Sequence, residues 1–269
     1  MIKKLLVFLC LTVFFNTSAR SDLIQTPYSG KPDKEPTITN EFKANDMRAV
    51  VIYIGGGNGQ FKWSSSKMTS DFPVTKAVID LHKKNITVLA PDWPYPMPLG
   101  AGVKYHCEKR CSDDHLYRLL GVMEYAQKMY PKKPIWIAGH SNGSISVEHF
   151  VKLLKKLNRL PELSGAIISG SRPETKINVP ELKLAFVAHK QDSCKKTIEN
   201  FDSLIKKHQE WLKNNFSVTW IEGGNNSGRY AKMGGSVGGP PVGCVGGTHS
   251  YEFAEEEATT KFRSIILGK

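Results

Sequence analysis

The chain has 269 residues, 40% of them hydrophobic, and a formal net charge of +12 at pH 7. This length and composition favour one α/β domain with a large core over two small domains, and the chain shows no internal repeat. An excess of lysine is typical of proteins that bind nucleic acids, but the lysines here are dispersed over the polar sides of predicted helices. We therefore expect a solvated surface and no nucleic acid, with attraction to anionic surfaces as the alternative.

Residues 1–19 have the pattern of a secretory signal peptide. Two lysines precede an apolar run from Leu5 to Phe15, and the small residues at Thr17 and Ala19 favour cleavage after Ala19. The apolar run is too short for a permanent membrane helix, and no later segment reaches the ~18 apolar residues that such a helix requires. We expect an exported protein, periplasmic or secreted, with no stable membrane insertion and a single domain over residues 20–269.

The first part of this domain is predicted to contain an extended lead-in followed by a buried strand. Prolines make residues 20–47 irregular, apart from an edge strand around 37–42. Residues 48–54 form an apolar run, which is typical of a strand covered on both faces. The glycine-rich residues 55–59 could cradle a phosphate, but Gln60 stands where a dinucleotide fingerprint needs glycine. No cofactor is expected.

A helix, a strand and a proline-rich segment follow. The apolar spacing predicts a helix over 74–84 and a strand over 86–90. Four prolines within residues 91–98 exclude regular structure, so the segment up to Cys111 is predicted to be a loop above the sheet. The next predicted helix is capped by Ser112 or Asp113.

Residues 134–147 combine a strand, a sharp turn and a helix. Residues 135–138 are apolar, and from Asn142 onward apolar residues recur at intervals of three and four, as on one face of a helix. Between them lies Gly139-His140-Ser141-Asn142-Gly143, the G-x-S-x-G pattern that exposes a serine hydroxyl on a strained strand-to-helix corner. Because the pattern occurs in this context, Ser141 is the candidate nucleophile.

The last part of the chain is predicted to alternate strands and helices. In chain order we expect strands at 165–169 and 182–188, a helix at 195–214, a strand at 217–221, a glycine-rich loop at 223–247 and a helix at 249–267. Such alternation implies an α/β fold, with a mostly parallel, doubly wound sheet and helices on both faces. No insertion is long enough for a large lid domain.

A nucleophilic serine needs a base within hydrogen-bond reach and an acid that holds the base in one tautomer. In doubly wound sheets functional groups collect at the carboxyl ends of strands, and this selects Asp192 as the acid and His249 as the base. Asp92 and Glu222 also follow strands and are the weaker candidates for the acid.

With this order of serine, acid and histidine, residues 48–267 resemble the α/β-hydrolase superfamily, and the elbow around Ser141 is the most specific match. The resemblance implies that Ser141 is the nucleophile, that Asp192 orients His249, and that His249 is general base and then general acid.

The same resemblance implies an oxyanion hole. Its donors would be the backbone N–H of Asn142 and a second N–H from the glycine loop, at Gly57 or its neighbour Gly56. The histidine that often precedes such glycines is replaced here by Ile54 or Gly55, so the second donor is left open.

Four cysteines follow the signal segment, which in an exported chain favours disulfides. Cys194 lies shortly after the expected acid and Cys244 shortly before the expected base, so a bridge between them would join both catalytic loops. We predict this bridge together with Cys107–Cys111, although four cysteines allow three pairings. No metal is expected at Cys107 and Cys111, because no second Cys/His pair has zinc-finger spacing.

Trp63, Trp93, Tyr95 and His140 are the candidates for the substrate pocket, and aromatic residues that merely cover the sheet are an equal alternative. His140 is expected to pack or line the site rather than act as the base. His189 is either an ordinary loop residue or one that orders the acid loop.

The predicted function is hydrolysis of a small-molecule or acyl carboxylic ester through an acyl-enzyme on Ser141. A peptidase or thioesterase would use the same three residues, and a non-catalytic binding protein could keep the fold. Dispersed lysines and the lack of a carboxylate metal cluster argue against a nuclease.

Overall fold

The computed structural model describes residues 21–57, 59–61, 72–93, 103–172, 175–192, 195–228 and 247–269, with the backbone alone at 103–106 and 195–201. The predicted signal segment lies outside the described residues, and so do Trp63, Tyr95, Cys194 and Cys244.

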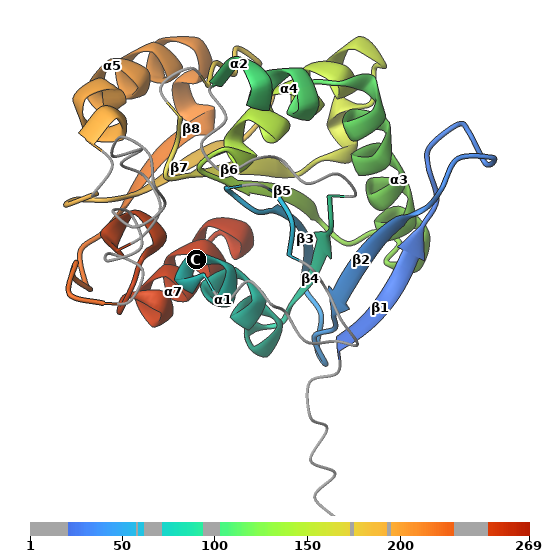
Figure 1. The fold of residues 1–269 in the computed structure, drawn as a ribbon, viewed down its shortest axis with the longest axis horizontal. Helices are drawn as coiled ribbons and strands as arrows, with labels where there is room; N and C mark the ends of the chain where they lie inside the picture. The colour runs from blue at the N-terminus through green and yellow to red at the C-terminus, as the bar shows by residue number, and fades with distance from the viewer. Residues whose placement is uncertain are drawn as a thin grey trace, which may run out of the picture.

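An eight-stranded sheet forms the centre of the described part of the chain, in the order β1-β2-β4-β3-β5-β6-β7-β8 (Figure 1). The six strands from β4 to β8 in this order run parallel, whereas β2 pairs antiparallel with both β4 and β1. This arrangement is the predicted, mostly parallel α/β sheet. The strands are β1 Ser21–Thr26, β2 Thr37–Phe42, β3 Ala49–Ile54, β4 Ile86–Pro91, β5 Ile135–His140, β6 Gly165–Ser169, β7 Leu184–His189 and β8 Phe216–Ile221.

Strand β3 shows why the central strands are apolar at every position. All six of its residues are buried. Val50 and Ile52 belong to the core on one face of the sheet, whereas Val51 and Tyr53 belong to the core on the other. Successive side chains point to opposite faces of a sheet, so a strand that is covered on both faces must be apolar throughout.

Helices cover both faces of the sheet. In Figure 1, α1 and α7 lie on one face and α2, α3, α4 and α5 on the other. The Ser112 side chain caps α3 by accepting a hydrogen bond from the N–H of His115, at 3.3 Å, which decides between the two predicted caps. The helices are α1 Pro73–Ile79, α2 Val103–Arg110, α3 Asp113–Met129, α4 Gly143–Lys156, α5 Lys195–Leu212 and α7 Glu255–Leu267, and short 3₁₀ turns span Asp80–Lys84, Leu160–Glu162, Lys213–Asn215 and Gly247–Ser250.

Two elements occur where the sequence predicted irregular chain. Strand β1 lies inside the lead-in and pairs with β2 at the edge of the sheet. Five of its six positions are exposed or partly exposed, so it lacks the apolar run that marks a central strand. Helix α2 lies in the segment predicted to be a loop, because the proline run ends at Pro98 and the helix contains no proline.

The ends of two predicted helices are wrong. The last helix begins at Glu255, not at His249, because Tyr251 and Phe253 adopt positive φ values of 62° and 66° that no α-helix accommodates. His249 therefore lies in a 3₁₀ turn. The helix predicted over 74–84 is α-helical only to Ile79 and continues as a 3₁₀ turn.

The carboxyl ends of the central strands bring distant residues together. The register pairs Ile54 at the end of β3 with Gly139 in β5, and pairs His140 at the end of β5 with Ser169 at the end of β6. Strand β7 ends beside them at His189. The described residues above this edge contain no lid domain, as predicted.

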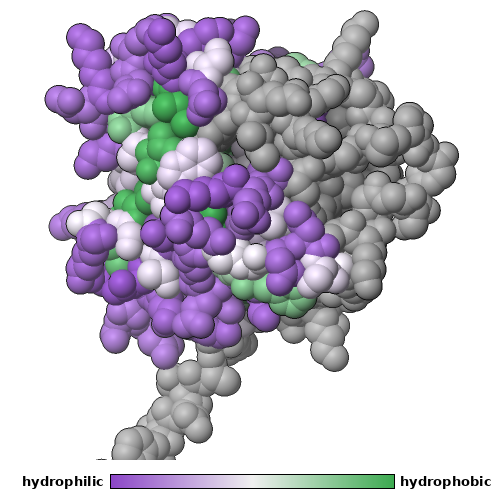
Figure 2. Space-filling model, turned by 90° about the vertical axis from the view of Figure 1, so that its left-hand side faces the viewer, coloured by the Kyte–Doolittle hydropathy of each residue, from purple (hydrophilic) through white to green (hydrophobic). Residues whose placement is uncertain are grey.

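The side of the molecule that carries α5, β8 and α7 is mostly hydrophilic, with hydrophobic atoms in small separate areas (Figure 2). Lys206 and Lys207 of α5 are both exposed there, in keeping with lysines on a solvated face. None of the helices within the described ranges is long and apolar enough to span a membrane.

Candidate active site

Ser141 lies on the turn between β5 and α4, as the elbow pattern predicts. Its φ is +51°, a left-handed value that is uncommon for a residue with a side chain, and its N–H donates to the carbonyl of Ser169 at 2.8 Å. Backbone strain of this kind persists where surrounding contacts impose it, and it is frequent at active sites.

The two glycines of the elbow are required by close packing. A Cβ at Gly139 would lie 2.4 Å from the carbonyl oxygen of Gly143, and a Cβ at Gly143 would lie 2.3 Å from the carbonyl oxygen of Ile54. Both distances are far below van der Waals contact, so α4 can start this close to β3 only with glycine at these positions.

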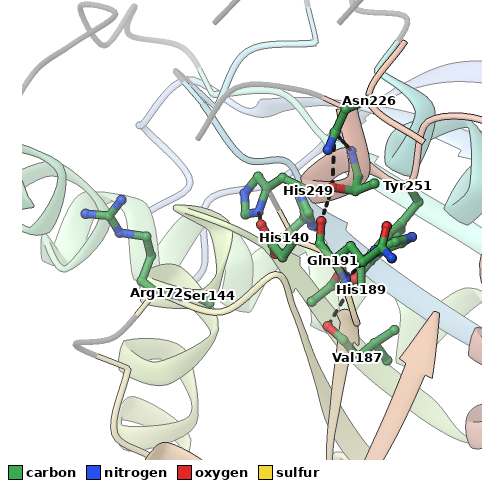
Figure 3. Close-up of polar contacts among 12 residues, drawn as sticks. His140, Ser144, Arg172, Val187, His189, Gln191, Asn226, His249 and Tyr251 are labelled. Atoms are coloured by element: carbon green, nitrogen blue, oxygen red, sulfur yellow. Dashed lines mark hydrogen bonds and ion pairs between the residues drawn. The ribbon is translucent and has the colours of Figure 1, made fainter. Parts of the chain in front are cut away.

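Ser144 supports the turn from inside the helix. Its hydroxyl donates to the carbonyl of Ser141 at 2.6 Å and accepts hydrogen bonds from the N–H of Arg172 and the hydroxyl of Thr175. Both partners follow β6, and Figure 3 shows Arg172 and Ser144 near one another. The loop after β6 therefore helps to hold the elbow.

Asp192 and His249 form a buried pair. The Nδ1 atom of His249 lies 2.9 and 3.0 Å from the two carboxylate oxygens of Asp192, and the two residues are only 2% and 4% exposed. A carboxylate on Nδ1 fixes the proton there and leaves Nε2 to act as the base. The acid and base predicted from chain order thus lie in the arrangement that a catalytic pair requires.

The weaker candidates for the acid have other partners. One carboxylate oxygen of Asp92 accepts from the N–H groups of Phe61 and Trp93, at 2.8 and 3.0 Å. Glu222 forms an exposed ion pair with Lys190 at 2.6 Å. The geometry favours Asp192 over both.

Hydrogen bonds join the loop of the acid to the loop of the base. The Thr248 hydroxyl donates to the carbonyl of Gln191, and the N–H of Thr248 donates to Asn226 Oδ1 at 2.8 Å. Gln191 and Asn226 lie beside His249 in Figure 3. The predicted bridge between Cys194 and Cys244, which would join the same loops, falls outside the described residues.

His189 orders the acid loop, one of the two roles considered for it. Its Nδ1 atom accepts from the N–H of Gln191 at 2.9 Å, which leaves Nε2 to donate to the carbonyl of Gly223 at 2.6 Å. The carbonyl of His189 also accepts from the N–H of Asp192. These contacts tie residues 189–192 to the carbonyl of Gly223.

His140 lies beside the base and is not placed to replace it. The ring centroids of His140 and His249 are 4.9 Å apart (Figure 3), and burial together with the neighbouring His249 lowers the pKa of His140 well below its usual value. Its Nδ1 atom lies 2.9 Å from the hydroxyl of Ser169. The expectation that His140 lines the site agrees with this position.

The protons around His140 can be assigned from its partners. The Tyr251 hydroxyl donates to the carbonyl of Val187 at 3.0 Å, so its oxygen accepts the proton of the Ser169 hydroxyl at 2.7 Å. Ser169 must then accept from His140, which places the proton of the neutral ring on Nδ1. Ser169 and Tyr251 were not predicted. The one signal for Ser169 is a polar residue at the end of a buried strand.

The two predicted oxyanion segments lie against each other. A Cβ at Gly56 would lie 3.0 Å from the carbonyl oxygen of His140 and 3.2 Å from the Cβ of Ser141, so the backbone of Gly56 packs closely against the elbow. The Asn142 side chain donates to the carbonyl of Gly57 at 3.2 Å, and Gly57 has a positive φ of 56°. The donor roles of Asn142, Gly56 and Gly57 stay predictions.

Trp93 is largely buried, and its role in the substrate pocket stays a prediction. It is 5% exposed and packs edge-on against the ring of His115 at 4.3 Å. In the loop after β4, the N–H of Trp93 donates to Asp92 Oδ1 at 3.0 Å. The other two aromatic candidates lie outside the described residues.

One group of residues in the described ranges could hold a metal ion. The ligand atoms of Cys107, Cys111 and His149 lie within 4.8 Å of one another. The Cα atoms of the two cysteines are 5.2 Å apart, a spacing that a disulfide spans, and their sulfur atoms are in direct contact. A metal would therefore compete with a bridge between the same two sulfurs.

Comparison with known proteins agrees with this fold. The solved structures with a similar fold include a dienelactone hydrolase from Anabaena variabilis, which is 10% identical with a TM-score of 0.59 and coverage of 93% of this chain and 98% of that one. Est1E from Butyrivibrio proteoclasticus is 15% identical with a TM-score of 0.53 and the same two coverages. No protein of curated function matches the chain.

The described part of the chain has the α/β-hydrolase fold. Residues 107–231 match the model of a family described as an α/β hydrolase of unknown function (DUF915). The matched segment contains the elbow and Asp192 and ends before His249.

Proposed function

We propose that this protein is an exported serine hydrolase that cleaves carboxylic esters through an acyl-enzyme on Ser141. The observation that carries the proposal is the buried pair of Asp192 and His249, which lies beside the strained elbow at the carboxyl end of the sheet. Groups from three separate loops lie near one another there, and their types are the ones that acyl transfer needs.

The reaction would proceed in two halves. His249 Nε2 takes the proton of Ser141 Oγ as the oxygen attacks the ester carbonyl, and the N–H groups of Asn142 and of Gly56 or Gly57 stabilise the oxyanion. His249 then protonates the departing alkoxide, and the alcohol leaves an acyl-serine. Water attacks this acyl group, with His249 again as base and then as acid, and releases the carboxylic acid and the free serine.

An ester is the substrate class that we favour over a peptide or a thioester. One protein of the same fold is named a dienelactone hydrolase, and a lactone is a cyclic ester. The three residues themselves fix acyl transfer and leave the leaving group open, so a peptidase or thioesterase is the second candidate.

Export, disulfides and surface attraction belong to the same proposal. The N-terminal pattern supports export to the periplasm or beyond, where bridges Cys107–Cys111 and Cys194–Cys244 would persist. The formal net charge of +12, which becomes +10 when Lys3 and Lys4 leave with the signal segment, supports weak attraction to anionic surfaces. Neither a cofactor nor a metal is part of the proposed reaction.

The first test is labelling with a fluorophosphonate, which reacts only with an activated serine. The purified protein should be labelled at Ser141 by peptide mapping, and Ser141→Ala should abolish the label and lower ester hydrolysis by about a thousandfold or more. The rates of hydrolysis are then compared for aryl esters of graded acyl length, matched thioesters and peptide anilides. This comparison ranks the leaving groups.

The possible results separate the candidates. Faster turnover of esters than of thioesters and anilides supports the proposal, and the reverse order moves the assignment to the second candidate. An unlabelled serine in folded, oxidised protein would favour a non-catalytic binding protein that keeps the fold.

A further inference from the structure

Arg110 is a buried arginine close to the proposed oxyanion hole that the reaction described above does not use. It is the last residue of α2, and its side chain is 1% exposed. Arginine is seldom buried this completely unless its charge is paired.

The guanidinium of Arg110 is held by neutral oxygens. Its Nη2 atom donates to the carbonyl oxygens of Gly55 and Gly57 at 3.2 and 3.3 Å, and Nη1 donates to the hydroxyl of Ser146 at 3.1 Å. Ser146 also contacts His115 Nε2 at 2.8 Å. None of the described residues forms an ion pair with Arg110.

A buried charge with neutral partners is costly. Burial lowers the pKa of Arg110 to about 9, which still leaves the side chain protonated at neutral pH. Hydrogen bonds to carbonyls offset only part of the desolvation of a cation. A negative charge that develops near this cation during a reaction would recover part of that cost.

The contacts of Arg110 fix the orientation of the glycine loop. In a planar trans peptide the C=O and N–H groups point in opposite directions. The carbonyl of Gly55 faces Arg110, so the N–H of Gly56 in the same peptide points away from it. The carbonyl of Gly56 is held as well, because it accepts from the N–H of Gly59 at 3.0 Å. All three loop carbonyls are therefore engaged in hydrogen bonds, and Gly56 packs against Ser141.

We propose that Arg110 is the positioning residue of the oxyanion loop. It holds the carbonyl of Gly55 so that the N–H of Gly56 faces the substrate carbonyl oxygen at Ser141, and it anchors the loop at the carbonyl of Gly57. Its charge polarises those peptides and stabilises the oxyanion. This inference rests on the proposed function and extends it to a residue that no sequence pattern marks.

A second buried arginine, Arg118, serves as a matched control for Arg110. Arg118 is also buried, at 4% exposure, but it donates to the carbonyl of Glu35 and to Asp114 rather than to the glycine loop. We would compare Arg110→Gln and Arg110→Lys with Arg118→Gln and Arg118→Lys. The folded fraction and the melting temperature of each variant are measured first.

The readouts separate positioning from general stability. For the best ester, Arg110→Gln should lower kcat about 100-fold with KM changed less than about threefold, because one oxyanion donor contributes a factor of this size. Arg110→Lys should recover part of the loss, and both Arg118 variants should keep kcat within about threefold.

A transition-state analogue gives the decisive comparison. A trifluoromethyl ketone with the acyl group of the best ester adds Ser141 Oγ and forms an oxyanion, whereas the matched methyl ketone binds without doing so. Across the Arg110 variants, the inhibition constant of the fluoroketone should rise in proportion to the loss of kcat/KM, and that of the methyl ketone should stay constant.

Each result has one interpretation. If Arg110→Gln lowers kcat no more than Arg118→Gln does, or if both ketones weaken equally, Arg110 has only a structural role and the inference is wrong. If the wild-type protein hydrolyses no ester and binds no fluoroketone, the proposed function itself fails, and the role of Arg110 fails with it.

Discussion

At the scale of single residues, the tautomers around the elbow follow from hydrogen-bond partners. The Nδ1 atom of His249 contacts the carboxylate of Asp192, and the Nδ1 atom of His140 contacts the hydroxyl of Ser169. The Nδ1 atom of His189 accepts a hydrogen bond from the N–H of Gln191. Of these three rings, His249 alone has a carboxylate on Nδ1. A carboxylate stabilises the imidazolium that forms during proton transfer, so His249 is the ring suited to act as the base.

This assignment predicts the effect of Asp192→Asn. The amide keeps the size of the side chain but removes the charge that fixes the tautomer, so kcat for ester hydrolysis should fall roughly 10⁴-fold with little change in the melting temperature. Steady-state kinetics on the best ester measures the effect. Glu222→Gln is the matched control, because this exposed carboxylate pairs with Lys190 away from the histidine, and its kcat should not change.

At the scale of elements, the elbow depends on how closely α4 starts against the end of β3. The first helical residue, Gly143, has no room for a side chain beside Ile54. Gly121 in α3 is equally confined, since a Cβ there would meet the carbonyl oxygen of Pro27, but it supports the packing of the lead-in and not the elbow. Substitution of Gly121 should therefore affect stability alone, whereas substitution of Gly143 should also affect the site.

Gly143→Ala should move the helix start and displace Ser141, so activity should fall more than 100-fold in protein that remains folded. Gly121→Ala should cost roughly 2–3 kcal/mol of unfolding free energy, as overpacking usually does, yet keep kcat per folded molecule. Urea unfolding and active-site titration with the fluorophosphonate measure both quantities. Equal losses of kcat in the two variants would contradict the special role of the elbow.

At the scale of the whole molecule, buried histidines make stability depend on pH. Burial lowers the pKa of His115, His140 and His208 below the usual value of 6.5. The folded state then resists protonation while the unfolded state takes up protons. Stability is complete above about pH 6.5 and is lost as the pH falls below that value toward the lowered pKa values.

The free energy of unfolding in urea should therefore decrease between pH 7.5 and pH 5.5. His208 contributes because its Nε2 atom accepts from the N–H of Ile177 at 3.1 Å, while its Nδ1 atom lies 2.8 Å from the carbonyl of Leu204. A proton on Nε2 would make this atom a second N–H donor that faces the N–H of Ile177. His208→Gln cannot titrate and should show a smaller decrease. Stability that is constant or rises toward pH 5.5 would contradict this account.

Much of the site could be predicted because its signals are local or ordered along the chain. Ser141 lies in a contiguous five-residue pattern between an apolar strand and an amphipathic helix, and Asp192 and His249 follow strands in the order that the elbow implies. Ser169, Tyr251 and Arg110 carry no such signal, because each acts through partners that lie far away in the sequence. The position of His140 in the site could be predicted because it precedes Ser141 in the elbow, but its tautomer depends on Ser169 and Tyr251.

The sequence by itself determined the alternation of strands and helices, the central strands and the strand-turn-helix at Ser141, since apolar periodicity and glycine placement are local properties. Tertiary structure alone decided the pairing of β1 with β2, the start of the last helix after Tyr251, the burial of Trp93 and the contacts of Arg110. Each of these depends on which surfaces meet when the sheet is covered, and partners that are distant in the chain leave no periodic pattern at either position.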